Sequence, residues 1–361
     1  MVKYISNTIM PLYAESLALG NSDGPLFEKE GWALLSLARE ASAYIAKTLA
    51  VAGKRVMVPG YTCAVVSSPF RENGWNVAQY AIDENMRINA ESFLGLLECF
   101  KPDVVVAHPY SGQEFNEMEL ELLQKAKTQG CFILEDLTQA ALSKKRYDFI
   151  DAYTGSLRKW FNVPDGAFLE SNSIELPDWK NAEENTLFVE GMMQAQYIRG
   201  LYFQTDDKEL LLISRHMNEV MGEGGERKRP TKAHRMSDFS RRIMSQEDLA
   251  AADHQRMKNA RYLYEHLKDS PNCKMVFSDV SDITTGPLWL PVYADDPVKF
   301  RDTYLRPYKI AGVRQWLDGD YRTGIVSPSV DGLFHKLMHI PVSQHYTEED
   351  MQVIADAING K

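Results

Sequence analysis

Short apolar runs alternate with helical patterns between residues 55 and 134, and this alternation constrains the fold more than any other feature of the sequence. The apolar runs are typical of strands buried on both faces, and the segments between them have the spacing of amphipathic helices. The predicted strands are Arg55–Val58, Asn76–Ile82, Val104–His108 and Cys131–Leu134, separated by predicted helices at Thr62–Asn73, Ala90–Phe100 and Met118–Thr128. The sequence therefore predicts an α/β fold whose sheet is mixed but mostly parallel, with helices on both faces.

Further elements are expected on either side of this region. A single core rarely fills more than about 250–300 residues, so a chain of 361 residues is expected to hold two domains. We expect a large domain over residues 1–245 and a smaller α+β domain over residues 246–361. Apolar spacing, caps and strand-like runs predict helices at Leu34–Ala50, within Leu187–Val220, from Ser245 as N-cap and from Thr347, and strands at Leu288–Val292 and Gly312–Trp316.

Charge and cysteine content exclude several classes of function. The net charge of −10 argues against non-specific binding to nucleic acid. The four cysteines are scattered without the spacing of a metal site or a disulfide framework, so we expect no metal and a reducing cytoplasm. No apolar run approaches the ~20 residues of a membrane helix, and the N-terminal segment does not resemble a signal peptide, so no membrane partner is expected.

Two candidate functional residues follow strand-like runs. Asp136 comes after Cys131–Leu134, and Lys159 lies in a polar turn after Phe149–Tyr153. Ligands of open α/β sheets bind at the carboxyl ends of the strands. Pyridoxal 5′-phosphate (PLP) requires a lysine for its Schiff base and a carboxylate on its pyridinium nitrogen. Singly, the carboxylate is more often a helix cap and the lysine a solvated surface residue, so the pair together favours a PLP site.

The segments around this pair resemble the DegT/StrS family of PLP-dependent sugar aminotransferases, which have fold type I. The most specific match is Glu135-Asp136 with Gln139-Ala140, similar to the family's E-D-x-A-Q-A. Supporting matches are Val58-Pro59-Gly60-Tyr61-Thr62, Pro109-Tyr110-Ser111-Gly112-Gln113, Asp165-Gly166-Ala167, and Ile340-Pro341 with Tyr346-Thr347-Glu348-Glu349-Asp350. The resemblance runs from about Leu34 to the end of the chain and implies a homodimer with active sites at the subunit interface.

The resemblance implies roles for four residues around the cofactor ring. Lys159 would form the Schiff base and then move the proton between Cα and C4′. Asp136 would pair with the pyridinium nitrogen, and Gln139 would contact the 3-oxygen. Tyr61 would stack on the ring.

It also implies a phosphate side and a substrate side. Ser156, with Thr154, would bind the phosphate together with amides at the helix start near Ala38 and Arg39. On the substrate side, the basic segment 226–235 offers Arg229 for a diphosphate or carboxylate, and a small-domain Trp316 could line the pocket. The lysine turn departs from the family's S-F-x-x-x-K-N, because it reads Thr154-Gly155-Ser156-Leu157-Arg158-Lys159-Trp160.

The implied activity is transfer of an amino group, from glutamate, to a keto sugar carried on a nucleotide, for polysaccharide or glycoconjugate synthesis. Two alternatives keep the cofactor: another PLP reaction, such as dehydration or Cα chemistry of amino acids, and a non-catalytic PLP sensor. A third reads Ser156 to Lys159 as the S-x-x-K of a serine acyl enzyme, but the K-T-G motif that accompanies it is absent.

Overall fold

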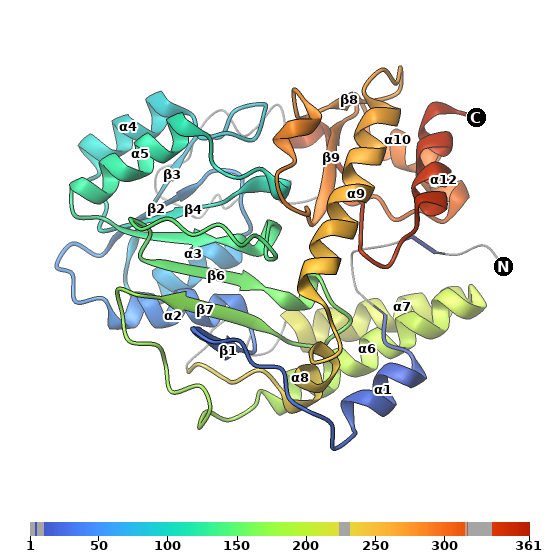
Figure 1. Ribbon diagram of the computed structural model, residues 1–361, viewed down its shortest axis with the longest axis horizontal. Coiled ribbons are helices and arrows are strands. Elements are labelled where there is room, and N and C mark those ends of the chain that lie inside the picture. Colours follow the sequence, from blue (N-terminus) through green and yellow to red (C-terminus); the bar gives the residue numbers. More distant parts are fainter. Residues whose placement is uncertain (1–3, 6–10, 224–231, 315, 317–333) are drawn as a thin grey trace. The chain divides into compact units, whose positions relative to one another are not determined.

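The computed structural model describes residues 4–5, 11–223, 232–314, 316 and 334–361 (Figure 1). The chain divides into two units. Unit 1 comprises Met1–Asn7, Ala50–Asp151 and Leu249–Lys361, and unit 2 comprises Thr8–Leu49 and Ala152–Asp248. Each is considered by itself.

Unit 1 contains the parallel strands that the sequence predicts. They are β2 (Arg55–Pro59), β3 (Asn76–Tyr80), β4 (Val104–Ala107) and β5 (Phe132–Asp136), in the order β5-β4-β2-β3. The intervening helices are α3 (Ala64–Glu72), α4 (Ala90–Cys99) and α5 (Glu117–Thr128), and α4 lies beside α5 in Figure 1. Since every residue of β4 is buried, its unbroken apolar sequence reflects a strand covered on both faces. The prediction of an α/β fold is confirmed.

Side-chain caps fix where the crossover helices begin. Asn116 accepts a hydrogen bond from the backbone nitrogen of Glu119 at 3.0 Å, and the Glu119 carboxylate accepts one from the backbone nitrogen of Asn116 at 3.1 Å. This capping box satisfies two backbone donors at the start of α5. Asn89 caps α4 in a simpler way, by accepting from the backbone nitrogen of Ser92 at 2.9 Å.

The remainder of unit 1 surrounds a small antiparallel sheet. Its strands are β8 (Lys274–Met275), β9 (Trp289–Tyr293) and β10 (Leu337–Pro341), in the order β10-β9-β8, and its helices are α9 (Leu249–Leu267), α10 (Pro297–Phe300) and α12 (Glu348–Asn359). Figure 1 places α9 beside α12. Thr347 caps α12 as predicted. Ser245 does not begin α9, however: it ends the preceding helix, and α9 starts at Leu249. The run Gly312–Trp316 forms only an isolated bridge, between Val313 and His339, within its described residues.

Among its described residues, unit 2 contains the antiparallel end of the seven-stranded sheet and several helices. The strands are β1 (Trp32–Leu35), β7 (Ala167–Ser171) and β6 (Ala152–Ser156), with β7 in the middle. The helices are α1 (Ala14–Gly20), α2 (Ala38–Thr48), α6 (Thr186–Thr205), α7 (Lys208–Met217) and α8 (Asp238–Met244).

The prediction of one helix over Leu34–Ala50 is wrong at its start. Trp32–Leu35 is a strand, and the helix is confined to α2. The Trp32 ring stacks on Phe168 of β7, with ring centroids 3.8 Å apart. All four residues of β1 are buried, so the strand has no polar alternation that would separate it from the helical spacing that follows.

Among the described residues, no helix has the length and apolar character needed to cross a membrane.

Candidate functional site

The candidate site begins where the parallel strands of unit 1 end. Tyr61 and Thr62 follow β2, His108 follows β4, and Asp136 ends β5. The hydroxyl oxygen of Thr62 lies 2.6 Å from Nε2 of His108, and Nδ1 of His108 lies 3.2 Å from the carbonyl oxygen of Asp136. A carbonyl can only accept, so Nδ1 carries the proton and Nε2 accepts from Thr62. His108 thus links all three strand ends by hydrogen bonding.

The Asp136 carboxylate is buried and held in place. One oxygen accepts a hydrogen bond from the backbone nitrogen of Thr138 at 2.9 Å, and the other lies 3.8 Å from Nδ1 of His108. Because carboxylate oxygens can each accept more than one hydrogen bond, these contacts leave acceptor capacity for a cationic N–H of a ligand.

Gln139 has a buried amide of which only one end is satisfied. It closes η2 (Leu137–Gln139), directly after β5. Its oxygen accepts from the backbone nitrogen and the hydroxyl of Ser111, each at 3.3 Å. Among the described residues its Nε2 has no hydrogen-bond partner. A buried N–H₂ without an acceptor is costly, and a ligand oxygen would satisfy it.

Tyr61 is packed between two aromatic rings. Its ring centroid lies 5.0 Å from that of Trp316, edge to face, and 5.9 Å from that of Tyr110. The Tyr110 hydroxyl donates to the Tyr61 carbonyl oxygen, and burial raises the pKa of the Tyr61 hydroxyl. Two residues singled out from the sequence, Tyr61 and Trp316, are therefore in contact.

Lys159 lies in unit 2, as the last residue of η3 (Leu157–Lys159) at the end of β6. The backbone nitrogen of Arg158 donates to the Gly166 carbonyl at 3.1 Å, and that of Trp160 donates to Leu157 at 2.8 Å. Trp160 is fully buried, so the residue at the position of the asparagine in the DegT/StrS lysine motif is a core residue. Lys159 itself is half-buried, on a turn closed by backbone hydrogen bonds.

A buried carboxylate supports the chain that follows Lys159. Asp165 accepts hydrogen bonds from the hydroxyl and backbone nitrogen of Ser237, at 2.6 and 3.0 Å, and from the hydroxyl of Ser240 at 2.5 Å. Burial raises the pKa of Asp165, although these donors oppose the rise. Next to it, Gly166 has φ 138°, and a Cβ there would lie 2.7 Å from the Met236 side chain. The return from the lysine turn is thus fastened to the start of α8.

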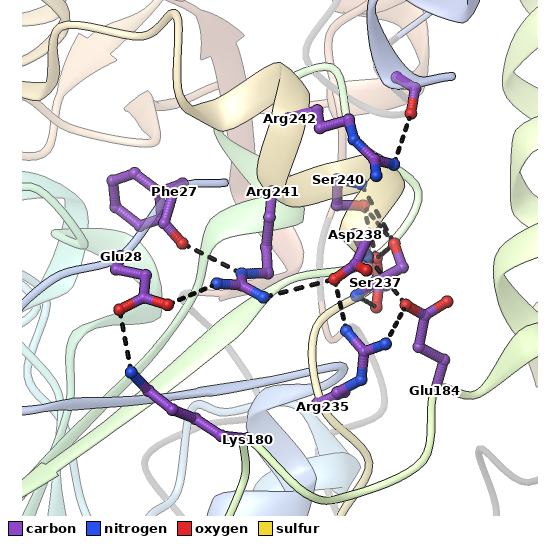
Figure 2. A network of polar contacts seen from close by, with 12 residues as sticks. Phe27, Glu28, Lys180, Glu184, Arg235, Ser237, Asp238, Ser240, Arg241 and Arg242 are labelled. Atoms are coloured by element: carbon purple, nitrogen blue, oxygen red, sulfur yellow. Dashed lines mark hydrogen bonds and ion pairs between the residues drawn. The ribbon is translucent and has the colours of Figure 1, made fainter. Parts of the chain in front are cut away.

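Ion pairs connect α8 to other residues of unit 2. The Arg241 guanidinium lies 2.9 Å from a Glu28 oxygen and 3.3 Å from an Asp238 oxygen. Figure 2 shows these pairs, and Arg235 between Asp238 and Glu184. Although Arg241 is almost fully buried, Glu28 is half exposed. Solvent-exposed ion pairs contribute little to folding stability, so we infer that this network serves mainly to orient α8.

The expected phosphate-binding residues occupy separate elements of unit 2. Ala38 and Arg39 are the first two residues of α2. Ser156 ends β6 and is buried, without capping η3 through its side chain. The Thr154 hydroxyl donates to the Phe168 carbonyl at 2.8 Å, so its proton is engaged within the sheet.

A buried Glu–His pair beside α2 escaped sequence reasoning. A Glu40 oxygen lies 2.8 Å from Nδ1 of His234, and the other accepts from the backbone nitrogen of Leu37 at 3.3 Å. Only a polar residue on the apolar face of α2 could have indicated it.

Arg229 lies outside the described residues. The described part of the chain has no cluster of three or more His, Cys, Asp or Glu residues suited to a metal.

This chain resembles known proteins in its three-dimensional structure. No protein-family model matches the sequence, and no curated protein matches it. A DegT DnrJ EryC1 StrS aminotransferase from Brucella abortus is 15% identical with a TM-score of 0.63, covering 99% of this chain and 91% of that one. The sugar aminotransferase CalS13 from Micromonospora echinospora is 13% identical with a TM-score of 0.65, covering 100% and 99%.

A third structure contains a cofactor. NtdA from Bacillus subtilis, with bound cofactor PMP, is 12% identical with a TM-score of 0.62, covering 91% of this chain and 73% of that one. The TM-scores and the coverage show that the fold is shared, although the identities are low. The chain has the same fold as these aminotransferase structures, as the sequence resemblance implied.

Proposed function

We propose that this chain is a PLP-dependent aminotransferase of the DegT/StrS family that acts on a sugar. The observation that carries the proposal is the Gln139 amide, whose buried Nε2 lacks a partner among the described residues three positions after the Asp136 carboxylate. A buried acceptor and a buried unsatisfied donor at the strand ends suit a cofactor with a protonated ring nitrogen and a neighbouring oxygen. The fold shared with aminotransferases supports the same conclusion.

Four residues would hold the cofactor ring. When bound, PLP supplies an electron sink and carries the amino group between donor and acceptor. Asp136 would keep the ring nitrogen protonated, and Gln139 would donate to the 3-oxygen. Tyr61 would provide a flat apolar surface for the ring, while Lys159 would attach the cofactor and hold the proton that moves between Cα and C4′.

Further residues would hold the phosphate. Ser156 would donate its hydroxyl, and the backbone amides of Ala38 and Arg39 would supply N–H donors at the positive end of α2. Thr154 would join them by exchanging its bond to Phe168 for one to the phosphate.

The amino donor is proposed to be glutamate, and the acceptor a keto sugar linked to a nucleotide. Arg229 would contact its diphosphate or a carboxylate, and Trp316 would line the sugar pocket beside Tyr61. We further propose a cytoplasmic homodimer, with a cofactor-binding domain over residues 1–245 and a smaller domain over residues 246–361. The product would enter polysaccharide or glycoconjugate synthesis.

Trapping the cofactor tests the assignment of the lysine. The protein would be incubated with PLP, reduced with borohydride and mapped by peptide mass spectrometry. We expect the pyridoxyl group on Lys159 and its absence from Lys159→Arg, with Lys145→Arg as the matched control. A pyridoxyl group on another lysine would contradict the assignment.

A further inference from the structure

Two arginines on helices α6 and α7 of unit 2 have no counter-ion among the described residues. Arg199 lies in α6 and is partly buried, whereas Arg215 lies in the last turn of α7 and is exposed. Neither guanidinium forms a hydrogen bond or an ion pair with a described residue. The Nε of Arg199 is enclosed and still lacks an acceptor there. Because a donor withdrawn from water without an acceptor is costly, an acceptor from a ligand would stabilise this arrangement.

The packing of α6 against α7 brings the two arginines close together. The two helices lie side by side in Figure 1. The Ser214 hydroxyl of α7 donates to the Ala195 carbonyl of α6 at 2.8 Å, and both residues are fully buried. Arg199 lies one turn after Ala195 on the same face of α6, and Arg215 directly follows Ser214. This contact between the helices therefore fixes the positions of both arginines.

The two guanidinium groups repel each other. Burial, and then the charge of Arg215, lower the pKa of Arg199 to about 10, and no carboxylate of a described residue opposes this fall. Arg199 still carries its proton near pH 7, so two positive charges are held close together. An anion between them would replace this repulsion by two attractive interactions.

Two other arginines of unit 2 have carboxylate partners. Arg235 contacts Asp238 and Glu184. Arg241 contacts Glu28 and Asp238 (Figure 2). The arginines on α6 and α7 differ from these in having no carboxylate partner in the described part of the chain.

We propose that Arg199 and Arg215 form a binding site for the phosphate or diphosphate group of a small molecule. A guanidinium is planar and offers parallel N–H donors, so each can bind two oxygens of one anion. A carboxylate has only two oxygens, whereas a phosphate ester has three terminal oxygens and a charge of about −1.5 to −2 at pH 7, which suits two arginines. The inference goes beyond the proposed function and shares no residue with the proposed cofactor site.

Calorimetric titration with inorganic pyrophosphate at low ionic strength tests this site. Arg199→Met keeps an apolar stem without the charge, Arg199→Lys keeps the charge without the planar donor group, and Arg215→Gln removes the second charge. Lys208→Gln, at the exposed start of α7, is the matched control for the loss of a nearby positive charge. Ser156→Ala shows whether the probe binds instead at the proposed phosphate side of the cofactor site.

We expect Arg199→Met and Arg215→Gln each to weaken pyrophosphate binding by about tenfold or more, because each removes charge-assisted hydrogen bonds. Arg199→Lys should bind with intermediate affinity, since a point charge cannot replace the planar donor group. Lys208→Gln and Ser156→Ala should change the affinity by about twofold at most.

Urea unfolding gives a second measurement. Without multivalent anions, Arg199→Met should be at least as stable as the wild type, because it removes the repulsion and the unsatisfied Nε. Pyrophosphate should raise the urea midpoint of the wild type more than that of the variant, because a ligand that binds only the folded state stabilises it.

Several outcomes would overturn the inference. One is a wild type that does not bind pyrophosphate at millimolar concentrations. Another is an affinity that the two arginine variants leave unchanged, or that Lys208→Gln or Ser156→Ala lowers as much as they do. A loss of stability in Arg199→Met without anions would reveal a partner for Arg199 within the protein. PLP binding is measured separately: a wild type that binds pyrophosphate but no PLP would refute the proposed function alone, and the converse would refute this site alone.

Discussion

At the residue scale, the candidate site is defined by how buried polar atoms are satisfied. Asp136 has donors from Thr138 and His108 nearby and remains an acceptor. The side-chain oxygen of Gln139 accepts hydrogen bonds from Ser111, and its Nε2 has no partner among the described residues. Because folding alone does not reward such an unsatisfied donor, the ligand oxygen proposed above would account for its presence in the core.

Replacing Gln139 by Glu tests this donor. The substitution keeps an oxygen facing Ser111 but puts a second oxygen where the amide nitrogen was, so it should oppose the cofactor's 3-oxygen. We expect PLP affinity at pH 8 to fall by about tenfold or more. Titration of PLP against Gln139→Glu measures the effect, with Gln129→Glu at the end of α5 as control. Equal affinities in the variant and the wild type would show that Gln139 does not face the cofactor.

Glu135, one residue before Asp136, predicts a pH dependence of stability. Burial raises the pKa of its carboxyl to about 8, with opposing and reinforcing contributions from nearby charges. The folded state therefore keeps this proton up to about pH 8, whereas the unfolded state loses it near pH 4.5. The free energy of unfolding consequently falls as the pH rises from about 4.5 to 8. Glu135→Gln, which mimics the neutral acid, should therefore gain on the order of 3 kcal/mol relative to wild type between pH 5 and pH 9.

Urea unfolding of wild type and Glu135→Gln at the two pH values measures that difference, with Glu121→Gln on the surface of α5 as control. A difference between the proteins that does not change with pH would mean that Glu135 is ionised in the folded protein.

At the element scale, the sequence located the parallel strands of unit 1 to within a few residues, because each is an apolar run bounded by turn residues. β1 was missed because its identity depends on pairing with β7, more than 130 residues away in the register Trp32 to Glu170. The hydrogen bond between the side chains of Tyr61 and His339 could not be foreseen for the same reason, since nothing near either residue specifies the other. Local sequence patterns predict individual helices and strands, whereas contacts between residues far apart in the sequence depend on the whole fold.

The lysine turn offers a test at this scale. Asp165 joins the return from η3 to the start of α8 through three donated hydrogen bonds. Asp165→Ala leaves those buried donors without an acceptor and should cost about 3 kcal/mol of folding stability, and Ser240→Ala about 1 kcal/mol. Chemical denaturation measures both, with exposed Asp178→Ala as control. A loss in Asp165→Ala no larger than that in the control would mean that the carboxylate does not hold the turn.

At the scale of the whole molecule, fold is retained where sequence similarity is faint. The three solved structures share only 12–15% identity with this chain, yet their TM-scores are 0.62–0.65. At the lysine turn, Trp160 is a core residue. The fold could therefore be anticipated from the E-D-x-x-Q-A stretch, whereas the substrate could not, because its contacts depend on side chains that no motif specifies.

Absorbance spectroscopy gives the most direct test of the proposal that Lys159 holds PLP for transamination. The purified protein would be mixed with PLP and then with glutamate, for wild type and Lys159→Ala. We expect a band near ~410–430 nm in the wild type that fades on addition of glutamate while 2-oxoglutarate accumulates, and that is lost or altered in the variant. A band that ignores glutamate would contradict transamination from that donor, and the same response in Lys159→Ala would contradict the role of Lys159.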